Sequence, residues 1–419
     1  MELITKVFTA ISDLGGALAM PIVFTVFGLL VGMKFKDALR SGLLYGVGFS
    51  GLWLVLDYFL VGVADATVAI SENLGLSLDV TDAGWMVGAD IAFSSSLLPV
   101  SVVAIILVNV LLIAVGFLKT LNIDIWNYWI MITGGAIIYT YTGSYILGLL
   151  VVVLTSVIIA KLADIYAKNS WDAIDVPEGI SLPHMDTISM APICFVVNKV
   201  IDLIPGVRDW DLNLDSLQEK VGVFGEPVFM GFILGFVLGL FAGYGFTGAL
   251  SLGMVTATTM VLMPKICSVL MEALAPIAEA TQEMVMKKFN GKEVYIGMDA
   301  AVAAGHPTVL LTSIIVIPVM VLLSTVLPGN RMLPFGDLSS MALYVVWSVV
   351  AAKGNMFRSL VTATVAAIVY MYCGSFVAEA YTATAVALGA VSSGTLISSI
   401  SAGNPLYSIF LAIAKLFVR

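Results

Sequence analysis

Three apolar tracts constrain what this chain can fold into more than any other feature of its sequence. They run from Leu14 to Val31, from Val100 to Leu118 and from Pro307 to Leu327. Each is long enough to cross about 30 Å of hydrocarbon as a helix. Only 11% of the residues are charged, against about 25% in an average globular domain. We therefore predict an all-α polytopic membrane protein. Met1 to Lys6 has no small-residue cleavage site, so we assign it to the flank of the first span.

A short motif recurs half a chain apart, which indicates an internal duplication. Val87 to Ala92 reads Val-Gly-Ala-Asp-Ile-Ala, and Ile296 to Ala301 reads Ile-Gly-Met-Asp-Ala-Ala. Upstream, Val63 to Thr67 is matched in the same way by Ile277 to Thr281. Duplication in a chain this apolar is typical of transporters built from two repeats around a central site. A plain duplication retained only for folding is the alternative.

The distribution of Lys and Arg predicts how the repeats are oriented, because basic residues concentrate in cytoplasmic loops. Residues 34–40 carry three bases, whereas their counterpart in the second half, residues 242–249, carries none. Residues 63–96 contain five acids and no base, whereas residues 279–293 contain three lysines. The pattern therefore reverses from one half to the other, which favours inverted rather than parallel repeats.

Two further pairs of loops agree with inversion and one pair disagrees, since Lys119 and Arg331 lie in corresponding loops that cannot both be cytoplasmic. We predict two inverted repeats, residues 1–210 and 211–419, within a single membrane-embedded domain that spans the whole chain. Inversion requires an odd number of crossings per repeat, and we expect ~11 spans in all, with re-entrant hairpins. The N-terminus is then outside and the basic C-terminus is cytoplasmic.

The densest polar motif lies between Pro177 and Asp186, where two acids, a hydroxyl and a histidine fall within ten residues. Two prolines and a glycine prevent a continuous helix there. We predict a re-entrant segment whose tip presents His184 and Asp186 to a binding cavity, with Glu178 and Ser181 as further candidates. A cytoplasmic loop that feeds a span, with His184 in solvent, is the alternative.

The acids of the duplicated motif, Asp90 and Asp299, are also site candidates. Each closely follows a glycine and has no basic residue nearby in sequence. Ionisable groups within membrane segments are costly and mark transport pathways or ligand contacts; ordinary loop acids are the alternative. His306, the second of two histidines, follows Asp299 by seven residues and starts a span. It is a site candidate too, with a polar helix cap as an equally good interpretation.

A further candidate region is Trp126 to Ala160, which is too long for one span and too short for two. We expect it to break at Thr133 to Gly135 and at Tyr139 to Gly143. Non-helical backbone survives in a membrane only where protein or a water-filled cavity satisfies it. We therefore place Thr140 and Tyr141 in the cavity.

Other features favour ordinary structural roles. Most tryptophans lie at span edges, as expected of an interfacial belt, whereas Trp85 is close to Asp90. The cysteines Cys194, Cys267 and Cys373 lack CxxC spacing, so we expect them to fill the core rather than to bind metal or form disulfides. We predict no metal site and no cofactor. No basic stripe suggests a nucleic-acid partner.

Three motifs carry a resemblance to a known family: Pro177 to Met185, Gly297 to Thr308 and Leu333 to Leu338. They resemble the membrane component, enzyme IIC, of the bacterial galactitol phosphotransferase system, in the ascorbate–galactitol superfamily. The likeness covers essentially the whole chain. It implies a homodimer in the bacterial inner membrane, with a scaffold domain and a mobile core domain of two inverted repeats. It also implies that His184 and Asp299 bind the substrate.

The chain departs from the ascorbate branch of that superfamily at two places. It has Ala136, Thr140 and Tyr141 where we expect histidine and glutamines in that branch. After the shared histidine it has Met185 and Asp186 where we expect glutamines. These differences argue against an ascorbate ligand.

The resemblance implies a sugar-transport subunit that carries a neutral polyol, galactitol above all, inward by alternating access. Phosphorylation would come from a phosphocysteine on a separate cytosolic IIB subunit, supplied by IIA. No cysteine here has the cation-flanked setting of a reactive thiolate, so the chain is one component of an enzyme complex without a complete active site. The site candidates include no Lys or Arg, which favours a neutral ligand because carboxylates repel an anion.

The main alternative is a proton-coupled secondary transporter. An intramembrane enzyme would need paired aspartates on cytoplasmic loops to hold Mg²⁺, and we find none.

Overall fold

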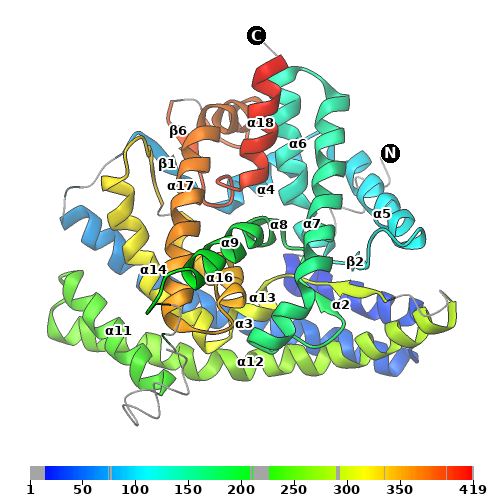
Figure 1. Cartoon of the computed structure of the whole chain (residues 1–419), viewed down its shortest axis with the longest axis horizontal. Helices are drawn as coiled ribbons and strands as arrows, with labels where there is room; N and C mark the ends of the chain where they lie inside the picture. The colour runs from blue at the N-terminus through cyan, green and yellow to red at the C-terminus, as the bar shows by residue number, and fades with distance from the viewer. Residues whose placement is uncertain are drawn as a thin grey trace.

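The computed structural model describes residues 15–417, apart from 74, 76–77, 208–209, 211–225, 289–292, 335 and 393. The predicted first flank, Met1 to Lys6, and the basic residues Lys292 and Arg419 lie outside the described residues. The described part is mainly helical, which confirms the predicted all-α class (Figure 1).

In the first half, the helices are α2 (Gly15–Leu30), α3 (Phe35–Asn73), α4 (Trp85–Ser94), α5 (Leu98–Ala114), α6 (Tyr128–Thr142), α7 (Tyr145–Ile174), α8 (Met185–Ile188) and α9 (Ala191–Asp202), with the 3-10 helix η1 (Ile125–Asn127). In the second half they are α11 (Pro227–Phe241), α12 (Gly245–Lys288), α13 (Ala301–Ala304), α14 (Pro307–Val326), α15 (Met341–Tyr344), α16 (Val346–Ala351), α17 (Met356–Ala387) and α18 (Pro405–Phe417), with the 3-10 helix η3 (Leu338–Ser340).

Five described helices are long and apolar enough to cross a membrane, and they lie in α3, α7, α12, α14 and α17. The pair α4 and α5, which meet at 98°, would make a sixth as a broken span. Several shorter apolar helices accompany them, among them α16 and α18. A multi-pass membrane protein is thereby confirmed, whereas the count of about eleven spans stays a prediction.

Two unusually long helices, α3 with 39 residues and α12 with 44, pack on each other and on α2 and α11. In Figure 1, α12 runs along the bottom of the molecule, and α6, α7, α17 and α18 stand above it. Glycines spaced four apart on α11 allow this close packing. A Cβ on Gly235 would lie 2.2 Å from Thr256 Oγ1, and one on Gly239 would lie 2.7 Å from Ala249 Cα.

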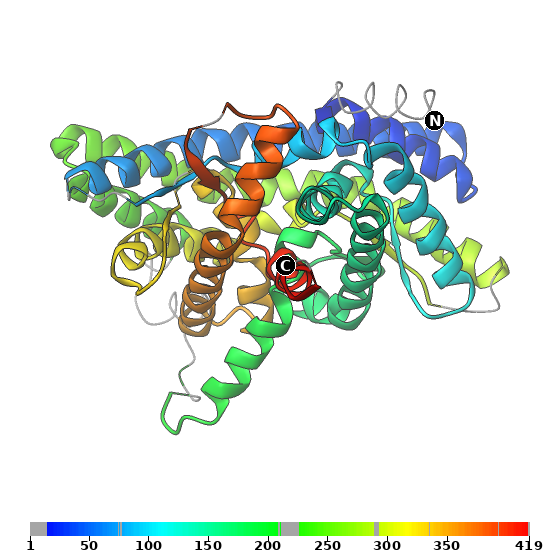
Figure 2. The ribbon, with the colours of Figure 1, turned by 90° about the horizontal axis from the view of Figure 1, so that it is seen from above.

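Six very short strands form two parallel three-stranded sheets above the long helices. One has the order β5 (Met332–Leu333), β1 (Val80–Asp82), β6 (Leu396–Ser398). The other has the order β2 (Thr120–Asn122), β4 (Tyr295–Gly297), β3 (Ile180–Ser181). In each sheet the central strand comes from one half of the chain and both outer strands come from the other half. The two halves are therefore interlocked (Figure 2).

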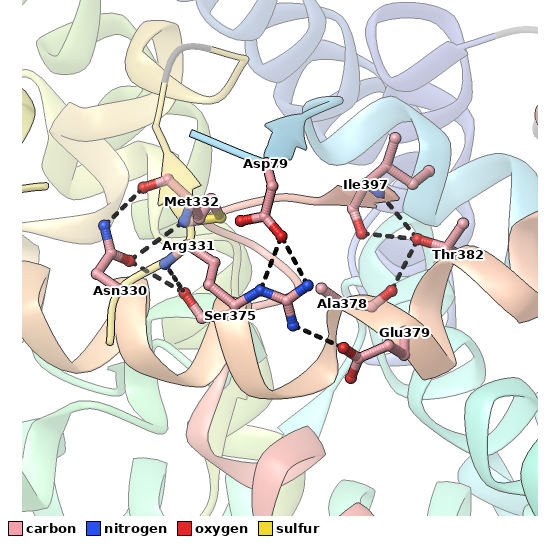
Figure 3. Close-up of polar contacts among 9 residues, drawn as sticks. All are labelled: Asp79, Asn330, Arg331, Met332, Ser375, Ala378, Glu379, Thr382 and Ile397. Carbon is pink, nitrogen blue, oxygen red and sulfur yellow. Dashed lines mark hydrogen bonds and ion pairs between the residues drawn. The ribbon is translucent and has the colours of Figure 1, made fainter. Parts of the chain in front are cut away.

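Ion pairs lie beside each sheet, near the start of its strands. Beside β5, Arg331 Nη2 lies 2.7 Å from Asp79 Oδ2 and Nη1 lies 2.6 Å from Glu379 Oε1 (Figure 3). The hydrogen bond from Arg331 holds the pKa of Asp79 below its ordinary value. Beside β2, Lys119 Nζ lies 2.7 Å from Glu293 Oε2, and Lys168 Nζ also approaches this acid at 3.6 Å.

The predicted break at Thr133 to Gly135 is wrong, because α6 continues through these residues. Their glycines instead allow close packing: a Cβ on Gly134 would lie 2.6 Å from the Tyr407 ring. The helix ends where the second break was expected. Gly143 adopts a left-handed conformation with φ 70°, and Ser144 caps α7 by accepting a hydrogen bond from the Leu147 amide.

Candidate functional site

A pocket lies where the segments that follow the strands of both sheets converge. Its carboxyl, imidazole and amide side chains are those of His184 after β3, Asp299 after β4, Asn127 after β2, and Asp186 on α8. The remaining lining residues are Trp53, Trp85, Trp126, Trp129, Ser340, Leu343 and Tyr344. Two carboxylates, one imidazole and four indoles thus surround one cavity. The described residues that line it include no Lys or Arg.

The register of β3 against β4 brings His184 and Asp299 together. Ser181 pairs with Gly297, so the chain segments leave the two strands side by side. A Cβ on Gly297 would lie 2.9 Å from the Asn122 Cα, so this position needs glycine for the strands to pack. The His184 Nδ1 and Asp299 Oδ1 atoms are then 2.8 Å apart, and both side chains are buried.

Asp299 is held from three directions. Besides the contact with His184, its Oδ1 accepts a hydrogen bond from the Ala301 amide at 3.0 Å. Its Oδ2 accepts one from Asn127 Nδ2 at 2.9 Å, and the same amide nitrogen donates to Asp124 Oδ2 at 2.7 Å. Partners that are themselves buried fix a carboxylate in one orientation, which suits a binding site that must be preorganised.

Two buried polar atoms in the pocket wall have no partner among the described residues. Asp186 Oδ2 accepts a hydrogen bond from Ser401 Oγ at 2.6 Å, while its Oδ1 is unpaired. The Nε1 of Trp129 is unpaired as well. Unsatisfied buried polar groups are rare, because each loses its hydrogen bonds to water. An acceptor and a donor on pocket-lining residues therefore have no partner among the described residues.

Asp124, His184 and Asp299 also form a potential cation site, since their ligand atoms all lie within 4.8 Å of one another. The donor set would be two carboxylate oxygens and one imidazole nitrogen. In the structure, His184 Nδ1 is already engaged with Asp299. The three groups therefore hold one another in place, and a metal ion would have to displace that contact.

Three sequence candidates lie on the surface rather than in this pocket: Asp90, Thr140 and Glu178. Asp90 is eight residues beyond β1, on the exposed face of α4, whereas Asp299 is two residues beyond β4 and reaches the pocket. The buried face of α4 is formed by Gly88, Ala89, Ile91 and Ala92. Asp90 therefore does not line this pocket, and a role for it in binding stays a prediction.

The other candidates have local roles. Ser181 is fully buried and shares a hydrogen bond with Thr120 Oγ1 at 3.0 Å. His306 caps α14 by accepting from the Thr308 amide at 3.3 Å, which matches the alternative interpretation. Tyr141 is partly buried and, like Ser181 and His306, is not among the described residues that line the pocket.

Sequence reasoning missed Asp124, Asn127 and Tyr344. It also assigned Trp126 and Trp129 to the membrane interface, but Trp129 is 3% exposed and both line the pocket. The available signal was the run from Asn122 to Trp129, where three polar side chains stand among isoleucines and aromatic residues in an otherwise apolar chain.

Comparisons with known proteins agree with the motif resemblance. The family model described as the sugar-specific permease component of the PTS system, EIIC-GAT, matches residues 10–394. The chain belongs to this family. The permease is 35% identical over 400 residues to the PTS system galactitol-specific EIIC component of Escherichia coli, strains K12 and O157:H7, covering 96% of this chain and 88% of those proteins. It is 32% identical over 399 residues to a putative permease IIC component of E. coli K12, covering 95% and 91%. The predicted membership of a galactitol-type enzyme IIC family is confirmed.

Proposed function

We propose that this permease component binds galactitol in the pocket around His184 and Asp299 and carries it across the bacterial inner membrane by alternating access. A separate cytosolic IIB subunit, itself supplied by IIA, would phosphorylate the sugar. The observation that carries this proposal is the lining of the pocket, where fixed carboxylates and indoles occur together without a cation. The galactitol-specific name of the 35% identical relatives supports the choice of ligand.

A neutral polyol fits these groups better than a sugar acid does. Each hydroxyl of a polyol can donate to a carboxylate such as Asp186 Oδ1 and accept from a donor such as Trp129 Nε1. The flat apolar faces of Trp85 and Trp126 can pack against the carbon chain. An anion would meet carboxylates at low dielectric with no basic residue to offset the repulsion.

The interlocked sheets support inverted repeats at residues 1–210 and 211–419. Exchanging β1 with β4, β2 with β5 and β3 with β6 converts one sheet into the other, including its strand order. A two-fold relation between the halves would produce this exchange. Repeats of this kind let one half rock against the other during transport.

Ion pairs surround both basic residues of the one pair of loops that disagrees with inversion. Lys119 directly precedes β2, and Arg331 directly precedes β5. Their clusters carry opposite net charge: Lys119 and Lys168 surround the single acid Glu293, whereas Arg331 lies between two acids. The positive-inside rule counts Lys and Arg rather than net charge, so Lys119 and Arg331 still disagree with inversion, and the interlocked sheets carry the proposal.

We further propose that the permease is a homodimer and that α2, α3, α11 and α12 form its scaffold, while the helices around the two sheets form the core that moves. The described cysteines support a separate phosphoryl donor. Cys194 is buried beside Ser348, and Cys373 is partly buried. Neither is exposed as a thiolate that exchanges phosphate with soluble proteins must be.

A proton-coupled secondary transporter is the second candidate, because Asp124, His184 and Asp299 form a buried titratable cluster beside the pocket. The two functions differ in the product. Labelled galactitol should enter vesicles only when the phosphorylated IIB and IIA subunits are present, and it should be recovered as a phosphate ester. Uptake of unmodified galactitol that follows a proton gradient would replace this proposal with the second one.

A further inference from the structure

Asp337 is a fully buried carboxylate that does not itself line the pocket. It directly precedes η3 and accepts hydrogen bonds from three separate segments. Its Oδ1 accepts from the Trp85 amide at 2.6 Å. Its Oδ2 accepts from the Ser401 amide at 3.0 Å and from the Tyr344 hydroxyl at 3.4 Å.

Each of the three donors leads to the pocket wall. Trp85 and Tyr344 line the pocket directly. Ser401 acts one step further away, because its Oγ donates to Asp186 Oδ2 and thereby leaves Asp186 Oδ1 unpaired. Asp337 thus contacts the backbone amide of Trp85 and the hydroxyl of Tyr344, and it is linked to Asp186 through Ser401.

A matching arrangement lies around the other sheet. Asp124 directly precedes η1 as Asp337 precedes η3, and it lies beside Asp299 as Asp337 lies beside Asp82. His184 follows the end of β3 by three residues, as Ser401 follows the end of β6. In one arrangement His184 and Asp299 line the pocket, whereas in the other Asp337 and Ser401 are not among the lining residues and instead hold lining residues by hydrogen bonds.

We infer that Asp337 is a positioning residue for the substrate site, which sets the orientation of Asp186, Trp85 and Tyr344 without touching the ligand. This inference rests on the proposed function of the same pocket. An amide at this position could not replace the carboxylate, because its nitrogen would face either the Trp85 amide or the Ser401 amide, donor against donor.

The test is a double-mutant cycle on galactitol binding by the purified full-length protein. Asp186→Asn removes a charged acceptor and should weaken binding about tenfold, and Asp337→Asn should do the same. Independent effects would multiply to a loss of affinity of about a hundredfold in the double variant. If Asp337 acts partly through Asp186, the double variant should lose clearly less affinity than that. Full multiplication, or unchanged affinity in Asp337→Asn, would overturn the inference.

Asp164→Asn is the matched control. Asp164 is another buried carboxylate that accepts two backbone hydrogen bonds, from Lys119 at 3.0 Å and Thr120 at 2.7 Å, but it lies away from the pocket. This variant should unfold more easily and bind galactitol normally. A loss of affinity in Asp164→Asn equal to that in Asp337→Asn would show general loosening and overturn the positioning role.

A failure of the proposed function is recognisable separately, since the wild-type protein would then not bind galactitol. The positioning role is in that case decided by the structure of the Asp337→Asn variant. Displaced Asp186 and Trp85 side chains would support it, and unmoved ones would overturn it.

Discussion

Replacing Asp299 with asparagine tests the centre of the proposed site. The carboxylate accepts from His184 or shares a proton with it, and accepts from Asn127 and the Ala301 amide. Asparagine keeps the shape but has one acceptor oxygen and a donating nitrogen. That nitrogen would face a donor in either orientation, the Ala301 amide beside Oδ1 or Asn127 Nδ2 beside Oδ2. The change removes the charge and leaves the fold otherwise intact.

The magnitude follows from the kind of bond that is lost. A hydrogen bond to a charged group contributes about 1.5–3 kcal/mol, and 1.4 kcal/mol is a factor of about ten in affinity. If one galactitol hydroxyl donates to Asp299, Asp299→Asn should weaken binding by roughly ten- to a hundredfold. Equilibrium binding of labelled galactitol to purified protein measures this, with insertion and dimerisation checked separately.

Asp90→Asn is the matched control, because it makes the same chemical change at an exposed acid on α4. Its affinity should equal that of the wild type. The reasoning is refuted if Asp299→Asn binds galactitol normally, or if both variants lose affinity to the same extent. The second result would mean that Asp90 and Asp299 contribute equally to galactitol binding.

The remaining predictions concern the pocket and the topology. His184→Ala should abolish galactitol uptake while the protein still inserts, and normal affinity in this variant would remove His184 from the site. Trp129→Phe keeps an aromatic ring but loses the unpaired Nε1 donor, so galactitol affinity should fall severalfold in the same binding assay. In competition assays ascorbate should not displace galactitol, and displacement would contradict the argument from charge. Single cysteines at Glu379 and Lys168, both exposed, should be labelled from outside and from the cytoplasm respectively; labelling from one face would rule out inverted repeats.

The sequence alone predicted the membrane class and the family, and it singled out two residues, His184 and Asp299, that line the pocket. Long apolar tracts can be satisfied only inside a bilayer, so their chemistry needs no tertiary information. His184 and Asp299 stood out because ionisable groups are costly in such surroundings, and both lay in motifs shared with the family. The helix end at Gly143 was also predictable from the sequence, because a glycine followed by a serine is a local signal of a helix boundary.

Only the tertiary structure decided which other side chains share the pocket. Asp299 and Asn127 are 172 residues apart, and Asp186 and Ser401 are 215 apart, yet each pair is joined by a hydrogen bond. These contacts arise from the pairing of strands only two or three residues long, whose partners no local pattern specifies. The same cause separated Asp90 from Asp299: the motif was repeated, but the distance from the strand to the acid was not, so one side chain faces outward and the other faces the pocket.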